Sequence, residues 1–338
     1  MLVVRPALSA DLEVMVELGV ESGPGMTNLP AEPELLAQKL AISERSFACE
    51  VSEQGDEQYL FLLEEKESRQ VVGCCGIIAT IGLRRPFYSF RVLRLTHSSQ
   101  ELGSYEPVEV LQMVEEYRGY TEIGTLYLRP PWRRGGNGRF LSLSRFMFIG
   151  EYPERFATRV MAELRGVQDE DGQSVFWNAL GRRFFHMEFS QVDYLSAMGK
   201  YQFIADMMPK YPVYVRLLAE DAQEVIGVPH AATVPALKLL EGEGFRYEGC
   251  VDVFDAGPAV HCPVDQIRSV RESRTGTVGA VNKSMDFSQF LVCNCRLPDF
   301  RVARGQLLDR ETGLVDLSPS LAEALGVSVG DRVRFVRL

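Results

Sequence analysis

The sequence has few histidines, no long apolar run and fewer basic than acidic residues. Only four of its 338 residues are histidine, and the formal net charge is −10. No apolar run reaches the roughly 18 residues that cross a bilayer, and the first residues lack the charged-then-apolar form of a signal peptide. A nucleic-acid partner would favour a basic face. We therefore expect a cytoplasmic protein without a membrane or nucleic-acid partner, in which a local basic pocket can still hold a phosphorylated molecule.

The seven cysteines lack the spacing of a metal site or a disulfide framework. Their number is odd and their spacing irregular, which favours reduced thiols. Cys293 and Cys295 have the wrong spacing for a zinc knuckle, and no second pair accompanies them. We expect buried apolar thiols and no metal.

The composition and patterning are those of a globular α/β protein. Hydrophobic residues make up 46% of the chain and charged residues 24%, which is ordinary for this class. Strand, helix and strand follow one another between 121 and 167, which predicts a βαβ unit with neighbouring parallel strands. After Gly257-Pro258 the sequence changes to short β-like runs around one helix. We expect a main domain over 1–274, with an insertion around 173–225, and a small β-rich C-terminal subdomain over 275–338.

The most informative stretch runs from Thr121 to Ile149. It predicts a strand, a glycine-rich turn and a helix, and the turn has the pattern R-x-x-G-x-G from Arg133 to Gly138. The first N–H groups of a helix have no partner within it, and the helix dipole adds partial positive charge there. Glycines allow a ligand to approach the backbone closely. This stretch therefore predicts an anion site that suits a pyrophosphate.

Strand, R-x-x-G-x-G turn and helix together resemble the signature of the GNAT superfamily of acyl-CoA N-acyltransferases. The helical segment 236–241, followed by a glycine–phenylalanine step at Gly244-Phe245, is similar to a later GNAT helix. The resemblance implies a GNAT-type mixed twisted sheet flanked by helices, with the pyrophosphate of coenzyme A on the glycine turn.

A closer resemblance, over roughly residues 1–274, is to the arginine N-succinyltransferase family. The similar segments are Arg5-Pro6 with Asp11-Leu12, Thr27–Pro30, Trp132–Gly138, Ser144–Phe148, Phe176-Trp177, Met208–Lys210, Val225–Gly227 with His230, and Asp252–Pro258. The resemblance implies transfer of the succinyl group of succinyl-CoA, a cosubstrate and not a permanently bound cofactor, to the α-amine of L-arginine. That reaction opens the succinyl route of arginine degradation.

The same resemblance implies roles for individual residues. His230 is expected to be the catalytic proton donor and Leu126 a succinyl-CoA contact. The cofactor-binding residues expected around the phosphates are Arg133, Gly136, Asn137 and Gly138. The sequence departs from the usual family pattern at Arg129-Pro130-Pro131 and at Ala231, and neither change removes a group that the chemistry needs.

Amide formation from a thioester needs an amine that loses its proton and a thiolate that gains one. Histidine titrates near neutrality and can serve both steps. His97 is the second candidate after His230, His186 is expected to pack in the core, and His261 is the least suited. A backbone N–H near Leu126 would stabilise the oxyanion if the strand were bulged there, and the sequence does not reveal a bulge.

Charged side chains can also be matched to the substrates. The carboxylates of the succinyl group and of arginine need basic partners, and Arg84, Arg85, Arg91 and Arg94 flank one aromatic segment. The guanidinium needs carboxylates, for which Glu163, Asp252 and Asp255 are candidates. A structural salt bridge is the alternative for each of these residues.

Three functional alternatives stay open at the level of sequence. The same fold would serve another amine such as ornithine, or acetyl-CoA as the donor. The chain would otherwise be a regulatory subunit that acts with a related chain. Direct transfer is favoured over an acyl-cysteine intermediate, which requires a Cys–His pair. The expected assembly is a homo-oligomer or a hetero-oligomer with a related chain.

Overall fold

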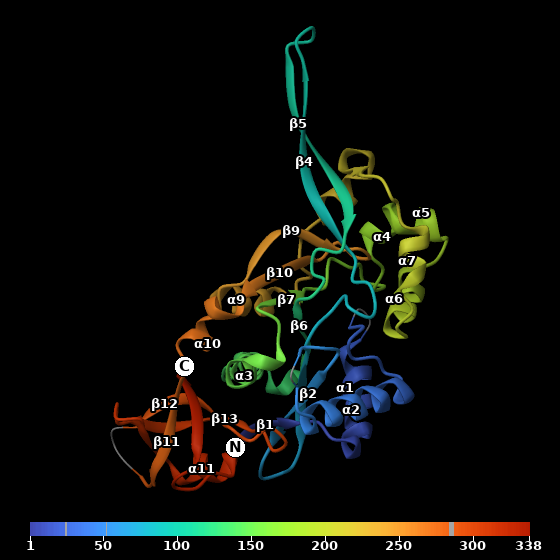
Figure 1. The fold of residues 1–338 in the computed structure, drawn as a ribbon. Coiled ribbons are helices and arrows are strands. Elements are labelled where there is room, and N and C mark those ends of the chain that lie inside the picture. The colour runs from blue at the N-terminus through green and yellow to red at the C-terminus, as the bar shows by residue number, and fades with distance from the viewer. Residues whose placement is uncertain (24–25, 52, 284–286) are drawn as a thin grey trace.

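The computed structural model of the chain describes residues 1–23, 26–51, 53–283 and 287–338. Within these ranges fifteen strands form one continuous hydrogen-bonded sheet, with helices on both of its faces (Figure 1). The strand order is β12-β15-β11-β14-β13-β1-β2-β3-β6-β7-β10-β9-β4-β5-β8. The mixed sheet flanked by helices that the sequence predicts is confirmed.

The main part of the sheet contains one parallel pair, β6 with β7. The two strands pair through Thr121 with Val160 and Glu122 with Met161, and no further pair follows among the described residues. Their carboxyl halves are therefore not hydrogen-bonded to each other. The strands of this part are β1 (Leu2–Pro6), β2 (Gln58–Glu65), β3 (Val71–Ile78), β4 (Ser89–Ser99), β5 (Ser104–Val114), β6 (Thr121–Leu128), β7 (Arg159–Glu163), β8 (Val213–Tyr214), β9 (Arg246–Asp252) and β10 (Pro258–Pro263).

Helices cover the two faces of the sheet with different apolar clusters. The helix α3 (Asn137–Glu151) lies on one face, where Phe140, Phe146 and Phe148 pack with alternate residues of β2, β3 and β7. The helices α1 (Leu12–Ser22) and α2 (Pro33–Ala48) lie on the other face and pack on the remaining residues of β2 and β3. Further elements near α3 are α9 (Val234–Gly242) and α10 (Arg268–Arg271). Side chains of β6 that alternate in sequence therefore face two different environments.

A group of short helices forms the segment expected as an insertion. These helices are α4 (Val175–Ala179), α5 (Gly181–Phe185), α6 (Phe189–Ala197), α7 (Gln202–Met207) and α8 (Glu220–Glu224). They pack around the fully buried Trp177 and against β9. The long hairpin of β4 and β5 stands out from the rest of the molecule at the top of Figure 1. None of the described helices is both long and apolar enough to span a bilayer.

The C-terminal strands close into a small ring. They are β11 (Arg274–Val281), β12 (Ser288–Asn294), β13 (Val302–Asp309), β14 (Leu314–Leu317) and β15 (Arg332–Arg337), with the helix α11 (Pro319–Leu325). The extra pairing of β12 with β13 closes this five-stranded barrel. β13 also pairs with β1, so the barrel adjoins the main sheet. The predicted division into a main domain over 1–274 and a C-terminal subdomain over 275–338 stays a prediction.

Candidate active site

The strand β6 has a bulge near its middle. Cys74 of β3 faces Tyr127 and Gly76 faces Gly124, so two residue steps on β3 match three on β6. Thr125 has a φ of 54°, a left-handed conformation that residues other than glycine seldom adopt. A bulge takes an extra residue out of the ladder. The backbone at Thr125 and Leu126 is therefore displaced from regular pairing, a bulge that the sequence analysis did not reveal.

The glycine-rich turn follows the end of β6 and leads into α3. Gly135 and Gly136 have φ values of 58° and 73°, and Gly136 is the N-cap of the helix. Asn137 N–H bonds back to Arg134 O. The N–H groups of Gly136 and Gly138 have no hydrogen-bond partner among the described residues. Two glycines in left-handed conformations thus turn free N–H groups and a positive dipole end outward, which suits a phosphate.

Arg133 and Asn137 are held in place around this turn. Arg133 Nε donates to Leu128 O at 2.8 Å, and its guanidinium lies 5.6 Å from the ring centroid of Tyr127. The amide of Asn137 is 7% exposed and donates to Trp132 O at 3.0 Å. Asn137 therefore fixes the shape of the turn with its side chain, and Arg133 is an exposed cation beside it.

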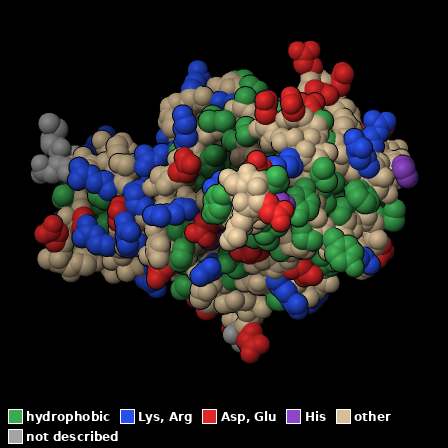
Figure 2. Space-filling view, turned by 90° about the horizontal axis from the view of Figure 1, so that it is seen from above, with side chains coloured by type: hydrophobic (Ala, Val, Ile, Leu, Met, Phe, Trp, Pro, Cys, Tyr) green, Lys and Arg blue, Asp and Glu red, His purple; other side chains and the backbone are tan. Residues whose placement is uncertain are grey.

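The C-terminal barrel contributes an arginine that the sequence did not indicate. Arg304 of β13 donates to Gly135 O at 2.7 Å and to Asn137 Oδ1 at 2.6 Å, and its guanidinium lies over the Phe140 ring. In a trans peptide the C=O and the following N–H point in opposite directions. Because Gly135 O faces Arg304, the N–H of Gly136 faces away from the barrel. Figure 2 shows basic side chains gathered over the left part of the molecule, where the barrel lies in Figure 1.

His230 is fixed against the segment that follows β7. Its backbone N–H donates to Arg165 O at 2.7 Å. Its Nδ1 lies 3.1 Å from Arg165 Nη2 and accepts a hydrogen bond from the Ala232 N–H, also at 3.1 Å. A guanidinium has no acceptor, so Nδ1 is unprotonated and the neutral ring has its hydrogen on Nε2. Burial and the charge of Arg165 both lower the pKa of His230, which favours this neutral form.

Two of the three carboxylates that were matched to the guanidinium have structural partners. Asp252 Oδ1 accepts hydrogen bonds from the N–H groups of Phe254 and Asp255 at 2.7 and 2.8 Å. The carboxylate of Asp255 accepts from Gly166 and Gly257 N–H, at 2.7 and 2.8 Å. These two aspartates therefore hold the loop between β9 and β10 against the end of β7.

Glu163, at the end of β7, is different. Its Oε1 is buried and has no hydrogen-bond partner among the described residues. Burial, together with the charges of Asp252, Glu122 and Asp255, raises the pKa of Glu163 well above its ordinary value. A buried carboxylate oxygen without a partner is costly, so this atom is suited to a cationic ligand.

A small, partly open cavity lies beside the bulge, on the face of β6 that is covered by α1 and α2. Its lining is Asn28, Lys39, Gln58, Leu60, Gly76, Ile77, Ile78, Glu122, Gly124 and Thr125. Asn28 Nδ2 donates to Glu122 Oε1 at 2.8 Å, and Lys39 Nζ donates to Asn28 O at 3.1 Å. The sequence motif around Thr27–Pro30 thus reaches the site, whereas Lys39 and Glu122 were not predicted. Residues 24–25 of the same loop lie outside the described residues.

The charges of the cavity residue Glu122, of Arg85 and of Glu163 all influence one half-buried hydroxyl, that of Tyr201. Burial raises the pKa of the Tyr201 hydroxyl, the charges of Glu122 and Glu163 raise it further, and the charge of Arg85 lowers it. Arg85 also acts on Lys39.

The other predicted arginines and histidines lie elsewhere. Arg84 pairs with Asp56, Arg91 with Glu116 and Arg94 with Glu109, which leaves Arg85 as the one of the four next to the site. His97 makes an edge-to-face contact with Tyr214 at the hairpin, and His261 makes such contacts with Tyr117 and Tyr120. The expectation that His186 packs in the core is wrong, because His186 ends α5 in a left-handed conformation and is exposed.

Cysteine chemistry finds no support in the site. Cys74 and Cys75 are fully buried in β3, and burial raises the pKa of both thiols, that of Cys75 to about 12. A thiol of this kind is a poor nucleophile. No group of three or more metal-binding side chains is found in the described ranges.

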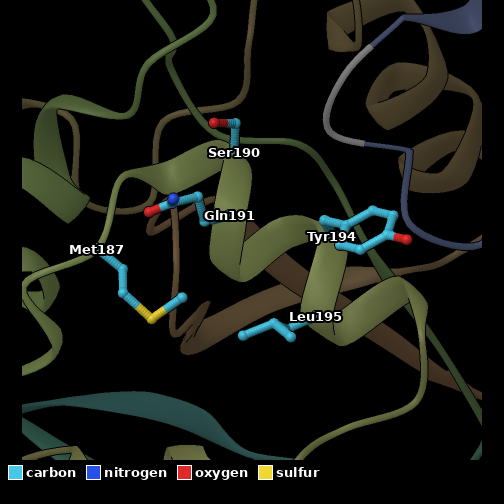
Figure 3. Close-up of a pocket in the computed structure, with 5 residues that line it drawn as sticks. All are labelled: Met187, Ser190, Gln191, Tyr194 and Leu195. Carbon is cyan, nitrogen blue, oxygen red and sulfur yellow. The ribbon is translucent and has the colours of Figure 1, made fainter.

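A surface hollow on α6 is the other notable depression (Figure 3). Its lining consists of Met187, Ser190, Gln191, Tyr194 and Leu195. This lining has no carboxylate, histidine or basic side chain, so it lacks the groups that acyl transfer requires. We assign it no part in the site.

Strands β6 and β7 form a parallel pair that separates, β6 has a bulge, and a glycine-rich helix start follows it, which together are the features of a GNAT-type acyltransferase fold. Within that class, the chain belongs to the arginine N-succinyltransferase family. The family model described as the arginine N-succinyltransferase beta subunit matches residues 2–269, and the model of its C-terminal domain matches 277–337.

Individual relatives are similar to this chain over its whole length. An arginine N-succinyltransferase of Shigella sonnei is 41% identical over 341 residues, which cover 100% of this chain and 98% of the relative. One from Escherichia coli O139:H28 matches to the same extent. Among solved structures, the arginine/ornithine succinyltransferase subunit AI of Pseudomonas aeruginosa has a TM-score of 0.90 at 38% identity. That match covers 100% of this chain and 98% of that one.

Proposed function

We propose that the protein transfers the succinyl group of succinyl-CoA to the α-amine of L-arginine and releases N2-succinylarginine and CoA. The observation that carries this proposal is the bulge of β6. It lies between a helix start suited to phosphates on one face and buried charged groups on the other. Membership of the arginine N-succinyltransferase family supports the same substrates.

The donor extends from the glycine turn to the bulge. The N–H groups of Gly136 and Gly138 bind its pyrophosphate, Asn137 keeps the turn in shape and Arg133 adds a positive charge. The thioester lies against Leu126, where the displaced backbone offers an N–H to the oxygen that becomes negative. Such preorganised donors commonly give the largest contribution to catalysis.

The acceptor lies at the end of β7. The unpartnered Oε1 of Glu163 binds the positive charge of arginine, and its raised pKa suits it to take a proton from the α-amine. The amine nitrogen attacks the thioester carbon, the C–S bond breaks and the sulfur gains a proton. His230 is the catalytic group at this sulfur: its Nε2–H donates a hydrogen bond that stabilises the departing thiolate, since Nδ1 is already occupied by two donors. The proton that the sulfur gains is the one that the amine nitrogen loses when the amide forms.

Release of the CoA thiol tests this function. The purified chain is incubated with succinyl-CoA and arginine, ornithine or no acceptor, and then with acetyl-CoA as the donor. We expect rapid release only with succinyl-CoA and arginine. Equal rates with acetyl-CoA would overturn the succinyl assignment. Ornithine is the second acceptor to compare, because the solved relative is named an arginine/ornithine succinyltransferase.

A regulatory role beside a related chain is the alternative from another class, and that relative is called a subunit. Under this alternative the pure chain releases no thiol with any acceptor until the related chain is added. We propose a cytoplasmic homo-oligomer or a hetero-oligomer with a related chain, and light scattering of the purified chain distinguishes it from a monomer.

A further inference from the structure

A half-buried lysine lines the cavity beside the bulge. Lys39 projects from α2, and its Nζ donates to Asn28 O at 3.1 Å. No carboxylate lies within 4.0 Å of Nζ among the described residues, although Glu122 is near enough to interact with it. An ammonium has three donors. Lys39 therefore has donors left for a ligand in the cavity.

The charges around the cavity favour an anion. Lys39 and Arg85 are positive, and Glu122 is the acidic group that faces them. Burial lowers the pKa of Lys39 to about 8 even though Glu122 acts in the opposite direction, so the ammonium is not fully balanced by its surroundings. One additional carboxylate would stabilise the charged form of Lys39 and balance the cationic excess.

The position of the cavity indicates which carboxylate it receives. Its wall includes Gly124 and Thr125 of the bulge, next to the thioester contact proposed at Leu126. A side chain at Gly124 would meet Asn28 Nδ2 at 3.1 Å, so the missing side chain keeps this approach open. The part of the donor nearest to this wall is the acyl group and not the phosphates.

We propose that Lys39 binds the terminal carboxylate of a dicarboxylic acyl group and so selects succinyl-CoA over donors with neutral acyl chains. Asn28 positions the ammonium through its carbonyl oxygen, and the positive charge of Arg85 also acts on Lys39. This inference rests on the proposed function and specifies how its donor is recognised.

The test compares succinyl-CoA with butyryl-CoA, which has the same chain length without the carboxylate. In K39M we expect kcat/KM for succinyl-CoA to fall about 100-fold, the scale on which a buried charge loses its partner. The value for butyryl-CoA should stay unchanged or rise, which also shows that the variant is folded. K66M is the control, since Lys66 pairs with Glu323 outside the cavity lining. An equal fall with both donors, or a higher KM for arginine alone, would overturn the inference.

If K39M does not fold, the pH profile of kcat/KM of the unmodified protein tests the inference. The charged form of Lys39 is lost as pH rises through about 8, so kcat/KM for succinyl-CoA should fall above that pH relative to butyryl-CoA. Parallel profiles for the two donors would contradict the inference. If the protein releases no thiol with arginine, the proposed function fails, and the equilibrium binding of the two donors still tests Lys39.

Discussion

The two faces of β6 differ in almost every physical respect. Toward α3, Ile123 and Leu128 join the large apolar cluster, and the anion site at the end of the strand consists mainly of backbone. Toward α1 and α2, Glu122 and the bulge border a cavity with buried charges. Backbone N–H groups suit the pyrophosphate, which is the same in every acyl-CoA donor. Charged side chains are suited to distinguish one substrate from another. The bulge is where the two meet.

The largest effect that tests this comparison is expected for His230→Ala. Loss of the Nε2 donor should lower kcat about 100-fold or more, the usual scale of acid–base catalysis. The affinity for CoA should not change, because the glycine turn is untouched. Stopped-flow thiol release and calorimetric CoA titration measure the two quantities. His97→Ala is the matched control at the hairpin, and a loss there instead of at His230 would refute the assignment.

A smaller effect is expected for Glu163→Gln, which keeps the size of the side chain and removes its charge. The value of kcat/KM for arginine should fall roughly 100-fold, the lower end of the scale for acid–base catalysis. The KM for succinyl-CoA should not change, since Glu163 belongs to the acceptor side. Glu248→Gln, at the surface partner of His261, is the control. A raised KM for the donor would mean that the two sides of the site are not separate.

The same contrast explains what the sequence revealed. The glycine turn is contiguous, and each of its residues acts through local backbone geometry, so the pattern from Arg133 to Gly138 predicted both the turn and its anion. Lys39, Glu122 and Glu163 lie on α2, β6 and β7 and meet only through the sheet topology. A single sequence contains no signal for such a meeting, and Glu163 was predicted only as one of three candidates. Arg304 is 167 residues from Asn137, too distant for any motif.

Arg304→Ala should have an effect of about 10-fold, on the KM for succinyl-CoA. Without the guanidinium, Gly135 O and the side chain of Asn137 lose their partner, and the Gly136 N–H is no longer held toward the phosphates. The value of kcat and the KM for arginine should stay the same. Arg301→Ala on the same barrel is the control, because Arg301 pairs with Asp299. Partial recovery in Arg304→Lys would separate positioning from a general loss of stability, and an unchanged KM would exclude the barrel from the donor site.

The smallest effect concerns the pH at which His230 gains a proton. Burial and Arg165 hold its pKa below the ordinary value of 6.5, so the neutral form persists as pH falls and is lost only below that value. In Arg165→Met the pKa should rise toward 6.5, because the positive charge is removed while the Arg165 carbonyl still holds the His230 backbone. The acid limb of kcat/KM should move to higher pH by the same amount, because a proton on Nδ1 removes the acceptor through which the Ala232 N–H holds the ring. NMR titration of the histidine ring measures the shift directly, with the resonance of His261 as the internal control. If the limb moves while the His230 resonance does not, the group that governs the acid limb is a buried carboxylate such as Glu163, and proton transfer belongs to the acceptor side of β6 alone.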